Sequence, residues 1–150
     1  VVEKEAWRCK KDQELGADLI LDPGDENILD KILEFTGYLG VDAAIDCSGN
    51  VKAQRLCIDA TRRKGKVAFV GECADDLVIK ASPDLIRKGL TIIGSWHYNL
   101  SDYQSIMKVI KSSPVVNKLI SHVFPMSKVQ EAMEACSSQK TAKVILKPWE

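Results

Sequence analysis

Several features that would mark a particular class of protein are missing from this chain of 150 residues. Its formal net charge is zero, because 21 lysines and arginines face 21 aspartates and glutamates, so no electrostatic attraction to nucleic acid or to an anionic membrane is expected. No apolar run approaches the roughly 20 residues that a membrane-spanning helix needs. The first residues, Val-Val-Glu-Lys-Glu, show neither the charged nor the apolar region of a signal peptide. We therefore expect no nucleic acid and no membrane among its partners.

Paired cysteines and metal-binding motifs are also missing. The five cysteines contain no C-x-x-C pair, and an odd, dispersed set of this kind is typical of free thiols in a reducing compartment, here expected to be the cytoplasm. The two histidines, His97 and His122, are not spaced with the cysteines as zinc ligands are. We assign no metal ligand in this chain.

Two short apolar runs are the most informative features that are present. Val41–Gly49 and Gly65–Gly71 each end in small residues, and a predicted helix over residues 51–64 lies between them. Near-continuous hydrophobicity predicts strands buried on both faces, and a helical crossover makes them parallel. Ligands of open parallel sheets bind beyond the carboxyl ends of the strands. The sequence thus places a site at Cys47-Ser48-Gly49 and at Gly71-Glu72.

The rest of the chain continues the alternation of strands and helices. Strands are predicted at residues 1–2, 18–22, 77–80 and 90–96, and helices at 3–15 and 28–35, with a helical turn at Ser82-Pro83. This rhythm predicts an α/β fold with a doubly wound parallel sheet. Beyond Trp96 the rhythm changes to a helix (101–111), a strand (119–124), a helix (127–136) and a strand (142–147), which indicates a different packing unit.

A Rossmann-type sheet normally begins with a strand that leads into G-x-G-x-x-G at a helix N-terminus, where a pyrophosphate binds. Nothing of that kind precedes Val1, and the chain does not begin with methionine. We interpret the chain as a piece of a longer protein, with a partial sheet that lacks its first β-α unit.

Glu3, at the end of the first strand, is a candidate cofactor residue. An acid at this place accepts hydrogen bonds from the adenosine ribose and repels a 2′-phosphate, which favours NAD over NADP. Lys4 and Arg8 weaken that preference, because a nearby cation accommodates the 2′-phosphate. The alternative is that Glu3 and Glu5 complement the N-terminus of the following helix.

The turns after the later strands are further candidates. The small residues of Cys47-Ser48-Gly49-Asn50 let a flat nucleotide approach the backbone, although any α/β protein has such tight turns. Gly71 in Val70-Gly71-Glu72 frees backbone groups in the same way. His97, just past another strand end, either contacts a cofactor or acts as an acid–base group, or is an ordinary exposed loop histidine. The basic run Arg62–Lys66 is interpreted as the solvated C-terminal end of a helix, where cations oppose the helix dipole.

The order and spacing of six segments make the chain resemble the medium-chain dehydrogenase/reductase family, particularly its zinc-dependent polyol and threonine dehydrogenases. The segments are Arg8–Asp18, Val41–Gly49, Gly65–Gly71, Gly89–Trp96, Leu119–Met126 and Lys143–Pro148. The resemblance implies that residues 1–95 are the latter part of a coenzyme domain. Residues 96–150 then return to the substrate domain, which is GroES-like.

The resemblance also implies a role for each candidate residue. Glu3 and Arg8 lie at the ribose and adenine, Cys47, Ser48 and Asn50 line the adenine-side cleft, Val70, Gly71 and Glu72 face the nicotinamide carboxamide, Ser95 and His97 border the nicotinamide, and Lys143 reaches the pyrophosphate. It further implies a dimer or tetramer assembled through the strand near Leu90–Gly94.

The activity implied is hydride transfer between a small alcohol, a polyol or a hydroxy amino acid, and NAD or NADP, with zinc polarising the alkoxide. The zinc ligands, the proton relay and the glycine motif of that family have no counterpart in this chain, so we assign it no catalytic residue and expect it to be inactive alone. Three alternatives stay open: a methyltransferase-type domain, a non-enzymatic nucleotide-binding or assembly module, and a zinc-independent reductase of the same superfamily.

Overall fold

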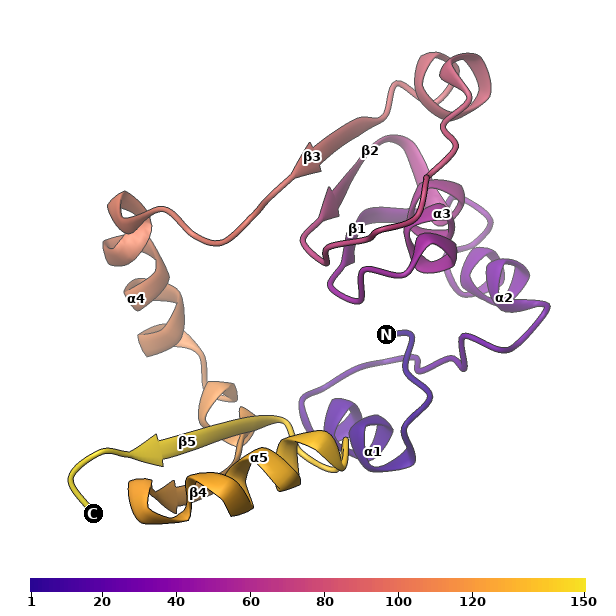
Figure 1. Cartoon of the computed structure of the whole chain (residues 1–150). Helices are drawn as coiled ribbons and strands as arrows, with labels where there is room; N and C mark the ends of the chain where they lie inside the picture. The colour runs from indigo at the N-terminus through magenta and orange to yellow at the C-terminus, as the bar shows by residue number, and fades with distance from the viewer. The chain divides into compact units, whose positions relative to one another are not determined.

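The computed structural model describes all 150 residues and shows two compact units (Figure 1). Unit 1 consists of residues 1–24 and 100–150, and unit 2 consists of residues 25–99. The predicted border between a coenzyme domain and a substrate domain, after Ser95, remains a prediction.

Unit 2 is built on a three-stranded parallel sheet. Its strand order is β1 (Val41–Asp46), β2 (Thr61–Phe69), β3 (Thr91–Gly94), and both pairings are parallel, which confirms the predicted α/β class. Helix α3 (Val51–Ala60) joins β1 to β2 and packs against both strands, and α2 (Ile28–Phe35) contacts α3 (Figure 1). A turn of π-helix (Ala81–Ile86) precedes β3.

The carboxyl ends of the three strands lie level with one another. Asp46 is in register with Phe69, and Phe69 with Gly94. Ile58 of α3 and Val67 of β2 are fully buried and form the centre of the unit. The prediction that the strands are buried on both faces is wrong for β1 and β3, most of whose residues are exposed or only half-buried, because α3, which packs against β1 and β2, covers only part of the sheet.

Unit 1 contains a second βαβ arrangement. β4 (Ile120–Pro125) and β5 (Lys143–Lys147) are parallel neighbours joined by α5 (Val129–Ser137). Helix α1 (Ala6–Glu14) follows the first residues, and α4 (Tyr103–Ser112) precedes β4. Short 3₁₀ turns span Leu100–Asp102, Val116–Leu119 and Met126–Lys128.

Helix α3 ends four residues before the predicted end at Lys64. The Thr61 hydroxyl donates to the Cys57 carbonyl at 2.6 Å, and the Lys88 ammonium donates to the carbonyls of Ile58, Asp59 and Thr61 at 2.7–3.0 Å. These bonds satisfy carbonyls that a longer helix would have used. The basic run Arg62–Lys66 therefore lies on β2, and its interpretation as a helix end is wrong.

Three predicted strands are absent as strands. Residues 77–80 are irregular, because their backbone groups form hydrogen bonds with side chains: Arg55 Nη1 donates to the Val78 carbonyl at 3.3 Å, and the Lys80 amide donates to Asp84 at 2.8 Å. Of the strands predicted at residues 1–2 and 18–22, only Val2 and Leu21 remain paired, in one isolated parallel bridge.

None of the helices combines the length and the apolar character needed to cross a membrane.

Candidate functional site

A single buried carboxylate, that of Asp46, organises the turn after β1. Its Oδ1 accepts hydrogen bonds from the Ser48 hydroxyl (2.6 Å) and the Ser48 amide (3.0 Å), and its Oδ2 accepts from the Gly49 amide and from Gln54 Nε2 (both 3.2 Å). Burial alone would raise the pKa of Asp46, but the hydrogen bonds from Ser48, Gln54 and Gly49 outweigh it and lower the pKa. The carboxylate is therefore ionised at neutral pH and fixes the turn.

The backbone of Asp46 also fixes the end of β2. Its carbonyl accepts from the amides of Val70 (2.9 Å) and Gly71 (3.1 Å). The two turns then touch at their glycines: a Cβ on Gly71 would lie 2.1 Å from the Gly49 nitrogen, and a Cβ on Gly49 would lie 1.9 Å from the Glu72 carbonyl oxygen. Only residues without side chains allow this approach, so both glycines are required by geometry.

The structure brings the predicted residues of these two turns together and shows what each can offer a ligand. The Ser48 hydroxyl donates to Asp46 and accepts from the Asn50 amide, and the Asn50 side chain caps α3 by accepting from the Lys52 and Ala53 amides. Both side chains thus have structural partners. The groups that remain available to contact a ligand are the exposed side chains of Cys47 and Glu72 and the backbone carbonyl of Val70.

Ser95 and His97 follow β3 at the same edge of the sheet. The Ser95 amide donates to the Phe69 carbonyl at 2.9 Å, so Ser95 continues the parallel pairing. His97 has a left-handed backbone (φ 60°), is exposed, and places its ring 4.2 Å from that of Trp96. An exposed histidine in a turn is able to contact a bound ligand, and the imidazole of His97 lies beside the Trp96 ring.

In unit 1, Glu3 and Arg8 line a hollow of about 210 Å³ together with Trp7, Lys11 and Thr141. Glu3 Oε1 accepts from the amides of Lys4 (2.8 Å) and Glu5 (2.9 Å), which fixes the carboxylate at the start of α1. Its Oε2 lies 3.9 Å from Arg8 Nη1. The helix-complementing interpretation of Glu3 thus agrees with the bonds of Oε1, and Oε2 has a cation beside it. The cofactor role of Glu3 stays a prediction.

Lys143, the last predicted cofactor residue, is exposed at the start of β5 and does not line this hollow. Glu3, Arg8 and Lys143 belong to unit 1, and the other eight candidate residues belong to unit 2.

Sequence reasoning missed Asp46 and Gln54 as organisers of the site. The signal for Asp46 was available, because an aspartate two residues before a serine at a strand end is a pattern for a side-chain-to-backbone turn. Gln54 had no such signal, since its contact with Asp46 depends on how α3 returns over the strand.

No group of three or more His, Cys, Asp or Glu side chains in the chain could hold a metal ion. The side chains present thus do not fit a zinc site, and we derive no reaction step through zinc. Within unit 2, the level strand ends with their small residues and the free Val70 carbonyl have the features by which a parallel sheet accepts a nucleotide.

The parallel sheet with its helical crossover places the chain in the α/β class, and comparison with known proteins narrows this class to a family. The family model described as zinc-binding dehydrogenase matches residues 1–112, so the chain belongs to that family. It is similar to a sorbitol dehydrogenase of Halalkalibacterium halodurans (30% identity over 142 residues, covering 94% of this chain and 41% of the relative). It is also similar to an L-threonine 3-dehydrogenase of Symbiobacterium thermophilum (24% identity, 95% and 41%).

Among solved structures, an alcohol dehydrogenase of Thermotoga maritima matches with a TM-score of 0.85 and 27% identity over 99% of this chain. The chain spans about two fifths of the length of these relatives, 41% and 42% in the cases named. Membership of the family confirms the predicted resemblance. Neither the methyltransferase nor the assembly-module alternative finds support in these comparisons.

Proposed function

We propose that this chain is the cofactor-binding and C-terminal portion of an oxidoreductase that transfers hydride between a small alcohol and NAD. The observation that carries the proposal is the pair of touching turns at Gly49 and Gly71, fixed by Asp46 at the carboxyl edge of a parallel sheet. In sheets of this kind that edge is where dinucleotides bind. The substrate class, a polyol or a hydroxy amino acid, follows the names of the relatives.

The ion pair between Glu3 and Arg8 supports NAD over NADP. Arg8 would be the group to receive a 2′-phosphate, but its charge is already shared with Glu3 at 3.9 Å. A 2′-phosphate would have to displace that carboxylate or lie against it, which like charges oppose. The second oxygen of Glu3 is placed to accept hydrogen bonds from ribose hydroxyls instead.

In this proposal each group of residues has a limited task. Glu3 holds the ribose, Cys47 and the Ser48 turn line the adenine side, the Val70 carbonyl and Glu72 face the carboxamide, and Ser95, His97 and Lys143 border the cofactor. NAD, when bound, supplies the hydride acceptor. None of these residues positions a metal or relays a proton, so the isolated chain is expected to bind NAD weakly and to oxidise no alcohol.

The test compares Glu3→Gln with the matched control Glu5→Gln, two residues further along the chain and directly before α1. Loss of a charge-assisted hydrogen bond to ribose is expected to weaken NAD binding about tenfold in Glu3→Gln and to leave the control within about twofold. Titration calorimetry with NAD and NADP gives both values. Equal NAD affinity in both variants, or alcohol oxidation by the isolated chain, would contradict the proposal.

The proposal extends to assembly and location. β3 is an edge strand, and the side chain of Ile93 on it is half exposed. An apolar edge strand of this kind favours pairing with another copy, so we place a homodimer contact at Leu90–Gly94.

All five cysteines are free, which supports a reducing compartment such as the cytoplasm.

A further inference from the structure

A buried glutamine of α3, Gln54, connects the two turns of the candidate site. Only 6% of its surface is exposed. Its Nε2 donates to Asp46 Oδ2 at 3.2 Å and to the Gly71 carbonyl at 3.4 Å. A primary amide has two N–H groups, so one side chain binds both the end of β1 and the turn after β2. Gln54 thereby links the helix to both strand ends.

The bond to Gly71 matters because glycine has no side chain to restrict the rotation of its backbone. The Gly71 amide donates to the Asp46 carbonyl at 3.1 Å, which fixes the peptide group before the Gly71 Cα. The Gly71 carbonyl belongs to the peptide group after the Cα, and this carbonyl accepts from Gln54. Gln54 therefore fixes the peptide group that joins Gly71 to Glu72.

The orientation of these two peptide groups decides what the turn presents to a ligand. In a trans peptide group the N–H and the C=O point in opposite directions, and the chain has no cis peptide bond. Because the Gly71 N–H points to Asp46, the Val70 carbonyl points away from Asp46. Because the Gly71 carbonyl points to Gln54, the Glu72 N–H points away from Gln54. Neither of these two outer groups has a hydrogen-bond partner within the chain.

One acceptor and one donor match a primary carboxamide, whose oxygen accepts and whose NH₂ group donates. In the proposed function this turn faces the carboxamide of the nicotinamide. We propose that Gln54 is a positioning residue for this end of the cofactor site, which acts through Gly71 by holding the Glu72 amide as a donor. The inference rests on the proposed function and adds to it a residue that does not touch the cofactor.

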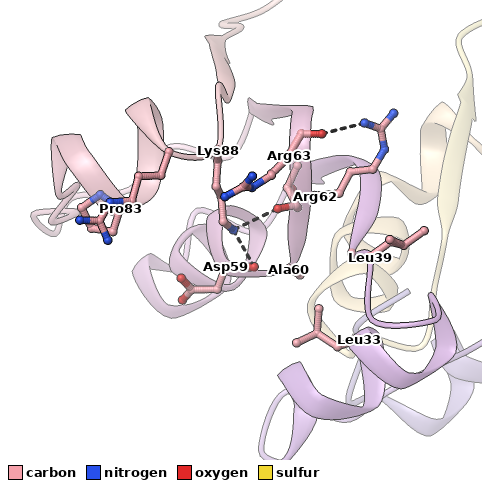
Figure 2. A pocket seen from close by; sticks show the side chains of 11 residues that line it. Leu33, Leu39, Asp59, Ala60, Arg62, Arg63, Pro83 and Lys88 are labelled. Carbon is pink, nitrogen blue, oxygen red and sulfur yellow. Dashed lines mark hydrogen bonds between the residues drawn. The ribbon is translucent and has the colours of Figure 1, made fainter.

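Helix α3 is a fixed support for Gln54, because both of its ends are held. At the N-terminus the Asn50 side chain accepts from two backbone amides. Figure 2 shows the pocket beside the C-terminus, where the Lys88 ammonium donates to the carbonyls of Asp59 and Thr61 at 2.8 and 3.0 Å. A helix held at both ends keeps the Gln54 amide at a constant place relative to the strand ends.

The test compares NAD with ADP-ribose, which has the same adenosine and pyrophosphate groups but no nicotinamide. Gln54→Met keeps the approximate size of the side chain and removes both of its N–H groups. NAD affinity is expected to fall about fivefold, because the donor to the carboxamide is no longer held in place. ADP-ribose affinity is expected to stay within about twofold, because this ligand has no group at the turn after β2. Titrations followed by amide chemical shifts give both dissociation constants.

Thr61→Val is the matched control, because it also removes a buried hydrogen bond at α3. The Thr61 hydroxyl donates to the Cys57 carbonyl at 2.6 Å, and Thr61 is the first residue of β2, whereas Gly71 follows the other end of that strand. If Gln54 only stabilised the fold, both variants would unfold at a lower temperature and keep the wild-type ratio of NAD to ADP-ribose affinity. The ratio is expected to change in Gln54→Met alone. An equal change in Thr61→Val would overturn the positioning role.

Gln54→Asn is a second variant that keeps a buried amide but shortens the side chain by one methylene. Its amide is too short to retain the bond to Gly71, which is already 3.4 Å long, so the same selective loss of NAD affinity is expected. In the chain without ligand, the carbonyl carbon resonance of Gly71 is expected to move in both Gln54 variants and to stay unchanged in Thr61→Val.

The outcomes separate this inference from the proposed function. If wild-type chain binds NAD and both Gln54 variants bind it equally well, Gln54 is not a positioning residue and the proposed function stands. If the wild-type chain does not bind NAD at all, the proposed function is wrong, and this inference is wrong with it.

Discussion

At the scale of single residues, Asp46 does most to shape the candidate site. Its carboxylate holds the turn after β1, and its carbonyl holds the turn after β2. Replacement by asparagine would turn an acceptor into an amide donor that faces the donors Gly49 N–H and Gln54 Nε2. A buried donor without an acceptor costs free energy.

Asp46→Asn is therefore expected to lower the free energy of unfolding by about 1–3 kcal/mol, as measured by urea denaturation. Asp42→Asn is the control on the same strand. The Asp42 side chain is 86% exposed, so the loss of its ion pair with Arg62 is expected to cost less than about 1 kcal/mol. A similar loss in both variants would contradict the organising role of Asp46.

The cysteines are expected to differ in reactivity because they differ in environment. Burial raises the pKa of the Cys57 thiol to about 11, whereas Cys47 and Cys136 are exposed. Only the thiolate reacts with alkylating agents, so iodoacetamide at pH 8 is expected to modify Cys47 and Cys136 first and Cys57 last. Peptide mass spectrometry over time gives the order. Early modification of Cys57 would show that α3 is not packed as described.

At the scale of elements, an ion network joins α3 to the π-helical turn. Arg55 donates through Nη1 and Nη2 to Asp84 at 2.7 and 3.0 Å, and it also pairs with Asp59. The hydrogen bond from Arg55, with that from the Lys80 amide, lowers the pKa of Asp84 to about 2 from its ordinary 3.8. The network holds a segment that has no strand partner of its own.

This network predicts a pH dependence of stability. Because the pKa of Asp84 is lower in the folded chain, its contribution is complete above the ordinary value of 3.8 and is lost as the pH falls from there towards about 2. Asp84→Asn is expected to remove part of this acid sensitivity and to cost about 1–3 kcal/mol at pH 7. Thermal unfolding between pH 2 and 7 measures both effects.

The exposed Asp76, in the same connection between β2 and β3, is the matched control. Asp76→Asn is expected to keep the wild-type pH profile. If Asp84→Asn also keeps that profile, the ion network does not contribute as described.

Elements whose bounds depend on neighbouring residues could be predicted from the sequence. Elements whose bounds depend on contacts with residues far along the chain could not. Helix α2 has the predicted bounds, Ile28–Phe35, because its apolar residues recur at helical spacing within the segment itself. The end of α3 depends on Lys88, almost 30 residues away, and no local pattern reveals that contact. The positions of the two site turns could be predicted from the strand ends. That the side chains of Ser48 and Asn50 already have hydrogen-bond partners could be seen only in the structure.

At the scale of the whole molecule, the chain buries little apolar surface within its units. Five apolar residues are buried: Leu21, Ile58, Ala60, Val67 and Ala132. Large apolar side chains such as Ile45 and Ile93 remain exposed at 65% and 49% on the outer strands of the sheet. Exposed apolar strands of this kind mark contact surfaces. This agrees with a chain that spans about two fifths of its relatives, 41% of the sorbitol dehydrogenase.

If the dimer forms through β3, a charged substitution on β3 and one on β1 are expected to have different effects on assembly. Ile93→Lys places a charge on β3, where it is expected to convert a dimer into a monomer, because charged residues on an edge strand block pairing. Ile45→Lys, on β1 at the other edge of the same sheet, is expected to keep the dimer. Light scattering after size-exclusion chromatography measures the mass. Dissociation by Ile45→Lys alone, or a monomeric wild type, would contradict the assignment of the contact to β3.

The central claim, that the touching turns at the carboxyl edge bind NAD, is tested most directly by mapping amide chemical shifts during a titration with NAD. Millimolar NAD is expected to shift the amides of Ser48, Gly49, Glu72 and His97 and to leave those of Arg63 and Arg87 unchanged. If NAD at saturating concentration shifts none of the first four amides, or shifts those of the opposite edge instead, the claim is wrong.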